Sequence, residues 1–339
     1  MNAKILMETA RAMVADGRGI LAADESTGTI EKRFKSIGVE NTEANRQAYR
    51  EMLFTTPEME KYISGAILFE ETLFQSTRDG KPFAKLLAEK GVIPGIKVDK
   101  GAKPLAGAQG ETVTEGLDGL RERLIKYREA GARFAKWRAV ITIGKGIPSD
   151  YCIETNAHAL ARYAALCQEQ DIVPIVEPEV LMDADNTIEV CEVVTNKTLA
   201  EVFRQLDHQR ILLEGMILKP NMVISGKQCA VQADVETVAA ATVRTLKRNV
   251  PSAVPGIAFL SGGQSDELAT AHLNAMNQMG PPPWLLSFSY GRALQAPSLK
   301  AWAGKPSNLA AGQLAFLHRA RCNSAAVLGR YSDEMEKAA

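Results

Sequence analysis

Eight short apolar segments recur along the 339-residue chain, each followed by a longer stretch of mixed polarity. They are continuous rather than alternating, which is typical of strands buried on both faces of a parallel sheet. The segments are residues 19–25, 65–70, 94–99, 134–140, 173–179, 212–219, 256–262 and 284–291. This feature constrains the fold more than any other, because a strand followed by a helix eight times predicts a (β/α)8 barrel.

The stretches between these segments show helical periodicity, most clearly over residues 156–170, 187–209 and 234–249. No glycine-, serine- or proline-rich linker interrupts the series. We therefore predict an α/β protein with a single-domain (β/α)8 TIM barrel over residues 1–339 and a short C-terminal tail from about residue 332. The main alternative is an open doubly wound sheet with GxGxxG in its first turn, whereas residues 24–28 read DESTG.

Charge and composition exclude several classes of protein. The 40 basic and 40 acidic residues cancel, so no global field would attract nucleic acid or an anionic membrane surface. No segment approaches the ~20 apolar residues that cross a bilayer, and the first residues do not resemble a signal peptide. The five cysteines are widely spaced and form no CxxC pair, which is typical of a reducing compartment. We expect a cytoplasmic protein with no nucleic-acid or membrane partner.

Polar side chains gather where the predicted strands end. Side chains two apart on a strand point the same way, so Lys136 and Arg138 share a face. Glu177 and Glu179 do the same. The other strand ends carry Asp24, Glu25, Lys97, Asp99, Lys219, Ser261, Gly262, Gly263, Ser289, Gly291 and Arg292. We place them at the carboxyl-terminal mouth of the barrel, where enzymes of this fold build their sites and where charges keep access to water.

Taken singly, these residues have simpler explanations. A lysine that ends a strand is commonly a solvated terminus. Asp24 is equally suited to cap the following helix, and Glu177 and Glu179 are suited to be structural ion-pair partners. Their occurrence together on one face favours a functional site, because independent accidents would not all fall there.

Two lysines beside several carboxylates indicate amine catalysis on a carbonyl group. At an unperturbed pKa near 10.4, only about one amine in a few thousand is neutral at pH 7, and burial or a second cation increases that fraction. Lys219 would attack beside Lys136, and a carboxylic acid, with Glu177 as first choice, would shuttle protons. The iminium accepts electrons when the adjacent carbon–carbon bond breaks, and Asp24 is a candidate base for the hydroxyl proton. Which of Glu177, Glu179 and Lys136 carries each proton stays open.

Two groups of candidate anion ligands flank this centre. The loops after the last two strands of a barrel often bind phosphate, and here they offer glycine N–H groups, hydroxyls and a guanidinium. The second group, Thr29, Lys32 and Arg33, follows the first strand, with Lys97 nearby in the barrel order. Lys32 and Arg33 are also suited to be exposed helix charges. Two anion sites imply a small substrate that is phosphorylated at both ends.

A metal-dependent mechanism is the main alternative for carbon–carbon cleavage. The chain has four histidines, His158, His208, His272 and His318, all in predicted helices or their flanks. None has a ligand spacing such as HxxxH. We therefore predict neither a catalytic metal site nor a cofactor.

Long motifs along nearly the whole chain occur in an order that is specific to one enzyme family. They are GILAADESTGTIEKR (19–33), PGIKVDKG (94–101), GLDGL (116–120), FAKWR (134–138), ARYAALCQ (161–168), IVPIVEPE (172–179), LEGMILKPNMV (213–223), FLSGGQS (259–265) and SFSYGRALQ (287–295). By these motifs the chain resembles the class I fructose-bisphosphate aldolases. The resemblance implies reversible, metal-free Schiff-base cleavage of fructose 1,6-bisphosphate to dihydroxyacetone phosphate and glyceraldehyde 3-phosphate. It also implies a homotetramer in glycolysis and gluconeogenesis.

The resemblance further implies a role for each candidate residue. Lys219 falls on the Schiff-base position, Glu177 on the proton-transfer carboxylate and Asp24 on the aspartate that acts at the C4 hydroxyl. Lys136 and Glu179 take the assisting positions. The positions that match the C1-phosphate site are Ser261, Gly262, Gly263, Ser289, Gly291 and Arg292. Those that match the region of the C6 phosphate are Ser26, Thr29, Lys32, Arg33, Lys97 and Arg138.

Two positions depart from the family pattern. Relatives commonly end in a flexible tail whose terminal tyrosine reaches the active site, whereas Tyr331 is followed here only by SDEMEKAA. This difference bears on iminium–enamine exchange and on the preference for a bisphosphate over a monophosphate. Thr29 stands where many relatives have serine, and the hydroxyl is kept.

Two other functions are alternatives to aldol cleavage of a sugar bisphosphate. A transaldolase-like Schiff-base barrel enzyme would need one phosphate site, so its activity would survive loss of Arg33. A non-catalytic scaffold would survive Lys219→Ala, and it would not require an intact set of amine, acid and base.

Overall fold

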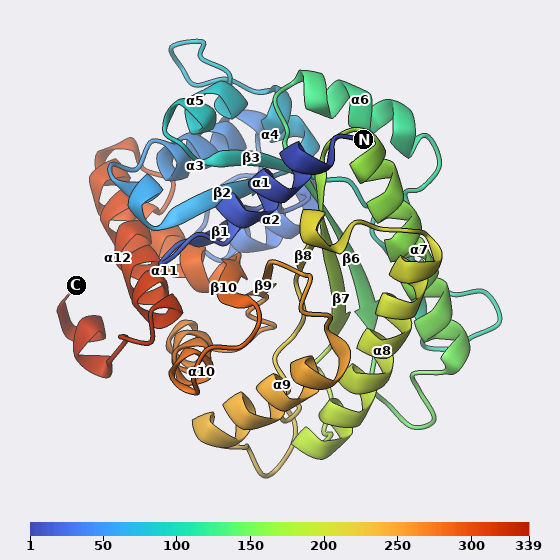
Figure 1. Cartoon of the computed structure of the whole chain (residues 1–339). Coiled ribbons are helices and arrows are strands. Elements are labelled where there is room, and N and C mark those ends of the chain that lie inside the picture. The colour runs from blue at the N-terminus through green and yellow to red at the C-terminus, as the bar shows by residue number, and fades with distance from the viewer. Residues whose placement is uncertain (339) are drawn as a thin grey trace.

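The computed structural model describes residues 1–338 and contains a closed barrel of eight parallel strands surrounded by helices (Figure 1). Around the barrel the strands follow the order β1, β2, β3, β6, β7, β8, β9, β10 and back to β1. Their bounds are β1 Gly19–Ala23, β2 Ile63–Leu68, β3 Ile93–Lys97, β6 Phe134–Ile141, β7 Val173–Val180, β8 Ile217–Leu218, β9 Gly256–Phe259 and β10 Leu285–Tyr290. The predicted single-domain (β/α)8 barrel is confirmed, and each of the eight predicted segments overlaps a barrel strand.

Helices connect the strands and cover the outside of the barrel (Figure 1). The α-helices are α1 Ala3–Met13, α2 Thr27–Lys35, α3 Glu43–Phe54, α4 Glu70–Phe74, α5 Phe83–Glu89, α6 Leu120–Glu129, α7 Asp150–Glu169, α8 Ile188–His208, α9 Val235–Asn249, α10 Asp266–Gln278, α11 Arg292–Trp302 and α12 Leu309–Val327. Short 3₁₀ turns are η1 Met59–Lys61, η2 Leu213–Gly215, η3 Pro306–Asn308 and η4 Asp333–Ala338. None of the helices within residues 1–338 is both long and apolar enough to cross a membrane.

The inner face of the barrel changes from apolar to charged along β1 and β7. Ile20 of β1 and Ile175 of β7 belong to an interior apolar cluster, and Asp24 and Glu177 follow further along the same strand direction to line a cavity. Helix α1 closes the amino end, because its Leu6 packs into this same cluster. In Figure 1 α1, in dark blue, lies in front of the barrel strands. The barrel is therefore filled at one end and open to a ligand at the other.

The aromatic ring of Phe134 occupies the barrel interior beside two glycines. A Cβ atom on Gly95 would lie 2.2 Å from the ring of Phe134, and one on Gly65 would lie 3.0 Å from it. Both glycines stand on strands beside β6 or one strand further on, so they provide the room that Phe134 takes. Interior volume, rather than backbone conformation, explains these two glycines.

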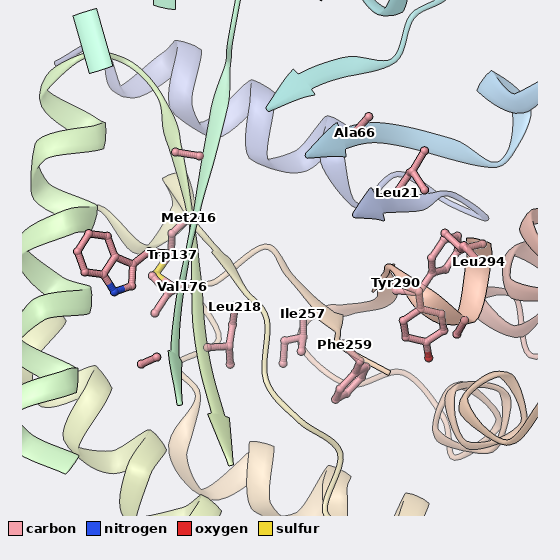
Figure 2. Packing of buried hydrophobic residues seen from close by; sticks show 14 of the residues in the cluster. Leu21, Ala66, Trp137, Val176, Met216, Leu218, Ile257, Phe259, Tyr290 and Leu294 are labelled. Atoms are coloured by element: carbon pink, nitrogen blue, oxygen red, sulfur yellow. The ribbon is translucent and has the colours of Figure 1, made fainter. Parts of the chain in front are cut away.

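The outward side chains of the strands pack against the helices. Figure 2 shows Trp137 on the helix side of its strand, together with Val176, Leu218 and Phe259 of the same apolar cluster. Trp137 stacks on Tyr163 of α7, with ring centroids 5.6 Å apart. Because Trp137 points outward, its two neighbours on β6 are directed into the barrel.

Several predicted strand ends differ from the structure. The segment 212–219 was predicted as one strand, but β8 is only Ile217–Leu218 and the 3₁₀ turn η2 precedes it. The side chain of Gln168 accepts from the Leu212 N–H and donates to its carbonyl, at 3.0 and 2.8 Å. These bonds replace the ladder bonds of a strand. A hairpin of β4 Ala102–Pro104 and β5 Thr112–Thr114 was not predicted.

The segment predicted as a short tail from about residue 332 is folded over its described part. Tyr331 is buried, and η4 follows it to Ala338, so the expectation for residue 339 lies outside the described residues. Glu336 of η4 accepts hydrogen bonds from Arg319 of α12 and from the Tyr331 hydroxyl. The end of the described chain is thus held against the outer helices.

Candidate active site

A cavity of about 540 Å³ lies at the carboxyl ends of the barrel strands. Every residue predicted for the site lines it: Asp24, Ser26, Thr29, Lys32, Arg33, Lys97, Lys136, Arg138, Glu177, Glu179, Lys219, Ser261, Gly262, Gly263, Ser289, Gly291 and Arg292. Six further lining residues are Ala22, Glu25, Leu181, Asp183, Lys227 and Leu260.

Lys219 lines the cavity and directly follows β8. Its N–H donates to Val176 O at 2.8 Å, so the backbone of β7 fixes its position. Its Nζ lies 3.3 Å from Glu177 Oε1, and Lys136 Nζ lies 3.6 Å from Glu177 Oε2. Lys136, Glu177 and Lys219 are each at most 4% exposed. One carboxylate therefore faces two buried amines.

Lys136 is shared by three carboxylates. Besides Glu177, its Nζ lies 2.7 Å from Asp24 Oδ2 and 3.9 Å from Asp99 Oδ2. Burial alone would lower the pKa of Lys136, but Asp24, Glu177 and Asp99 together raise it well above its usual value. Lys136 is therefore an ammonium ion throughout the neutral pH range, which provides a fixed positive charge beside the other groups.

The same cluster keeps Asp24 ionised. Burial by itself would raise the pKa of Asp24, but Lys136 and Lys219 hold it well below its usual range. Asp99 also accepts from Lys97, whose Nζ is 2.7 Å from Asp99 Oδ1. Asp99 was noted as a charge of the third strand but was not chosen as a site residue. Its position shows that it orients the two lysines.

Glu177 is the least satisfied member of the cluster. Its Oε2 is buried and has no hydrogen-bond partner among residues 1–338, although two amines lie nearby. Glu179, predicted to assist at the same centre, is instead the acceptor of the Arg138 guanidinium. Burial would lower the pKa of Arg138, and the Glu179 carboxylate raises it well above its usual value. The structure therefore gives Glu177 the free acceptor and Glu179 a fixed partner.

The loops after β9 and β10 line one side of the cavity. Gly262 and Gly263 have φ values of +57° and +85°, which glycine adopts without strain. Ser289 Oγ is buried and has no partner within the described residues. Helix α11 begins at Arg292, and Gly291 and Arg292 both line the cavity, so the helix starts at its edge. These groups donate hydrogen bonds and carry positive charge, as a phosphate requires.

A second basic region is built on α2. The hydroxyls of Ser26 and Thr29 lie 3.1 Å apart at its N-terminus. Arg33 is fixed by Glu25, whose Oε1 accepts at 2.5 Å, and Glu25 is also bound by buried Arg50 and by Gln295. Glu25 is the last residue of the first predicted strand. The sequence pattern alone did not predict that its carboxylate would position Arg33.

Two charged lining residues, Asp183 and Lys227, were not predicted from the sequence. Asp183 follows β7 and Lys227 follows β8, and their side chains form an ion pair at 2.6 Å. Each stands several residues beyond its strand, in a long loop whose path the sequence pattern does not predict. Their position in loops that follow barrel strands is the one feature of the sequence that could have indicated them.

The histidines lie away from the cavity. His318, Cys322 and Glu336 are the one group of three potential metal ligands found among the described residues, with ligand atoms within 4.8 Å of one another. None of them lines the cavity, and Arg319 donates to both oxygens of Glu336. His272 is buried and its Nδ1 lies 2.6 Å from Gln264 Oε1. The cavity itself is lined mainly by amines, guanidinium groups, carboxylates, hydroxyls and glycines, with three aliphatic residues.

Comparisons with known proteins agree with this geometry. A family model described as fructose-bisphosphate aldolase class-I matches residues 5–339. The chain is similar to a probable fructose-bisphosphate aldolase class 1 of Xanthomonas campestris pv. campestris, with 62% identity over 98% of this chain and 99% of the relative. It is 58% identical to the cytosolic fructose-bisphosphate aldolase 4 of Arabidopsis thaliana, over 94% of this chain and 82% of the relative. A solved fructose-bisphosphate aldolase of Plasmodium falciparum, in complex with TRAP and an inhibitor, has 53% identity and a TM-score of 0.96. That match covers 97% of this chain and 96% of the other.

Proposed function

Because the chain belongs to the class I fructose-bisphosphate aldolase family, we propose that its barrel mouth cleaves fructose 1,6-bisphosphate through a Schiff base on Lys219. The observation that carries this proposal is the buried arrangement of Lys219 and Lys136 around Glu177. The products are dihydroxyacetone phosphate and glyceraldehyde 3-phosphate, and the reaction is reversible.

Imine formation uses Lys219 and Glu177. The neutral amine attacks C2 of the open-chain ketose, and the carbinolamine then loses its hydroxyl as water with a proton from Glu177. Glu177 is suited to this step because it contacts the amine and keeps one oxygen without a hydrogen-bond partner among residues 1–338. Lys136 remains charged and orients Glu177 from the other side.

Carbon–carbon cleavage uses Asp24. The C4 hydroxyl gives up its proton, the C3–C4 bond breaks, and the electron pair moves into the iminium to form an enamine. A carboxylate with a lowered pKa is always ionised but is a weak base. We therefore infer that proton transfer to Asp24 accompanies bond cleavage, when the hydroxyl oxygen becomes a carbonyl and its proton becomes acidic. Protonation of the enamine at C3 and addition of water then release the second product.

Two phosphate regions select the substrate. The C1 phosphate is proposed to bind at Ser261, Gly262, Gly263, Ser289, Gly291 and Arg292, and the C6 phosphate at Ser26, Thr29, Lys32, Arg33, Lys97 and Arg138. The first region is supported by the Ser289 hydroxyl, which has no hydrogen-bond partner among residues 1–338, and by the start of α11. The second is supported by the fixed Arg33. A transaldolase-like enzyme would need one of these regions, so two regions favour the bisphosphate.

Borohydride trapping tests the central claim. The protein is incubated with dihydroxyacetone phosphate and EDTA, reduced, digested and mapped by mass spectrometry. A secondary amine on Lys219, together with cleavage activity that resists EDTA, is expected. Reduction without substrate is the control. The absence of an adduct, or the loss of activity in EDTA, would contradict the metal-independent amine mechanism.

We further propose a homotetramer that acts in the cytoplasm, in glycolysis and gluconeogenesis. The cytosolic plant relative and the five cysteines, all unpaired in the structure, support the compartment. Exposed apolar side chains such as Val193 and Val231 support an association surface. Light scattering after size exclusion would give about four times the 36.8 kDa chain mass if this is correct.

A further inference from the structure

A lysine that the sequence pattern does not single out lies beside the phosphate loop. Lys227 stands in the long loop between β8 and α9, and it lines the cavity. A Cβ atom on Gly263 would lie 2.7 Å from Lys227 Nζ and 3.5 Å from Arg292 Nη2. The two cations therefore flank the same glycine, and an anion held there would be within reach of both.

The backbone carries Lys227 to this position. Its N–H donates to Met182 O at 2.7 Å, and the Gly226 N–H donates to Asn186 O at 2.8 Å. A Cβ atom on Gly226 would lie 2.2 Å from Ala184 O, so glycine alone permits this approach. The loops after β7 and β8 are thus paired at the edge of the cavity. This backbone pairing, rather than the ion pair of its side chain, holds Lys227 at the edge of the cavity.

The ion partners of the two cations differ. Lys227 Nζ lies 2.6 Å from Asp183 Oδ1, and the side chains are 42% and 60% exposed. An ion pair as exposed as this one contributes little. Arg292 has no carboxylate within ion-pair distance among residues 1–338 and donates to Gln264 O at 3.2 Å. Lys227 can therefore leave Asp183 for a doubly charged phosphate beside Arg292 at small cost.

We propose that Lys227 is a specificity-determining residue for the C1 phosphate, which it contacts after releasing Asp183. The inference rests on the proposed function, because it requires a ketose phosphate between Gly263 and Arg292. Lys227 contributes to binding and takes no part in making or breaking bonds. Its loss should therefore change the KM of the substrate that carries this phosphate and leave kcat almost unchanged.

The condensation reaction separates the two phosphate regions. Dihydroxyacetone phosphate uses the C1 region and glyceraldehyde 3-phosphate uses the other, so each KM reports on one. In Lys227→Met, which keeps the apolar stem, the KM for dihydroxyacetone phosphate should rise about tenfold, with the other KM and kcat unchanged. Lys227→Arg should keep a KM close to that of the wild type. Lys247→Met, at an exposed lysine of α9 outside the cavity, is the matched control.

Asp183→Asn distinguishes a phosphate contact from a structural tie between the loops. If Lys227 contacts the phosphate, this variant keeps or lowers the KM for dihydroxyacetone phosphate, because the competing carboxylate is gone. A rise as large as that of Lys227→Met would overturn the inference, as would an unchanged KM in Lys227→Met. A wild-type protein that does not condense the two trioses would instead refute the proposed function, whatever the variants do.

Discussion

Two of the clusters of partly or fully buried charges in the molecule are built differently. The mouth cluster comprises Asp24, Lys97, Asp99, Lys136, Glu177 and Lys219, and all of these except Asp99 line the cavity. The Glu336 cluster comprises His318, Arg319, Cys322, Tyr331 and Glu336 and joins α12 to η4. Each has a buried cation, but only the first lines a space that a substrate can enter.

Hydrogen bonding separates the two clusters. Both oxygens of Glu336 have partners: Arg319 donates to each, and the Tyr331 hydroxyl donates to Oε1 at 2.8 Å. Burial would raise the pKa of Glu336, and Arg319 lowers it below its usual value. In the mouth cluster Lys136 is divided among three carboxylates, and Glu177 keeps an oxygen without a hydrogen bond among residues 1–338. Satisfied charges hold structure together, whereas incompletely satisfied ones are available for chemistry.

Lys219→Met should produce the largest effect and would sharpen the contrast. It removes the nucleophile, so kcat/KM for fructose 1,6-bisphosphate should fall at least about a thousandfold, while far-UV circular dichroism keeps the wild-type spectrum. Lys247→Met is again the control and should retain activity. Residual activity near that of the wild type would show that the mouth cluster does not use Lys219 as a nucleophile.

Lys136→Met should affect both activity and stability. It leaves Asp24, Asp99 and Glu177 buried with less positive charge, which should lower stability by about 3 kcal/mol or more and activity by about a hundredfold or more. Without Lys136, burial is expected to raise the pKa of Asp24 in the folded variant above its unfolded value. Asp24 then favours folding only in its protonated form, so its contribution to stability is lost as pH rises. Urea unfolding at pH 5 and pH 8 should therefore show the larger loss, relative to the wild type, at pH 8. An equal loss at both would contradict the assignment.

Glu336→Gln should affect stability alone. It leaves Arg319, whose side chain is 3% exposed, without its carboxylate, at an expected cost of about 2–3 kcal/mol. Glu334→Gln is a matched control, because Glu334 pairs with Lys337 at an exposed site. Urea midpoints should separate the two variants, with kcat/KM unchanged in both. A large decrease in kcat/KM for Glu336→Gln would show that the Glu336 cluster also supports catalysis, and would contradict its assignment as purely structural.

His272 should produce the smallest effect, visible only as a pH dependence. Burial lowers its pKa from 6.5 to about 4, so the folded protein favours the neutral ring. Its stabilising contribution is complete above pH 6.5 and is lost as pH falls toward 4, by about 2 kcal/mol between pH 7 and pH 5. Urea unfolding of the wild type should show this loss. His272→Asn keeps a donor for Gln264 without titrating, and it should show a smaller loss over the same interval.

The barrel was predictable because each strand is buried on both faces and leaves a continuous apolar run. The boundaries of β8 were not, because Gln168 binds the Leu212 backbone from a distant helix and turns a predicted strand into a 3₁₀ turn. The site residues were identified because charges at strand ends and long family motifs coincide. Asp183 and Lys227 escaped notice because they lie in loops whose path depends on contacts between those loops.

Sequence alone determined the fold, the family resemblance and the residues that line the cavity floor. These follow from local patterns, since alternate residues on a strand face the same side and all parallel strands end at one edge. Tertiary structure decided which charges are paired. Glu179 is committed to Arg138, whereas Glu177 faces two amines and retains an oxygen without a hydrogen bond among residues 1–338. Pairing depends on distances of a few ångströms between separate strands, and the chain sets those distances only when the barrel closes.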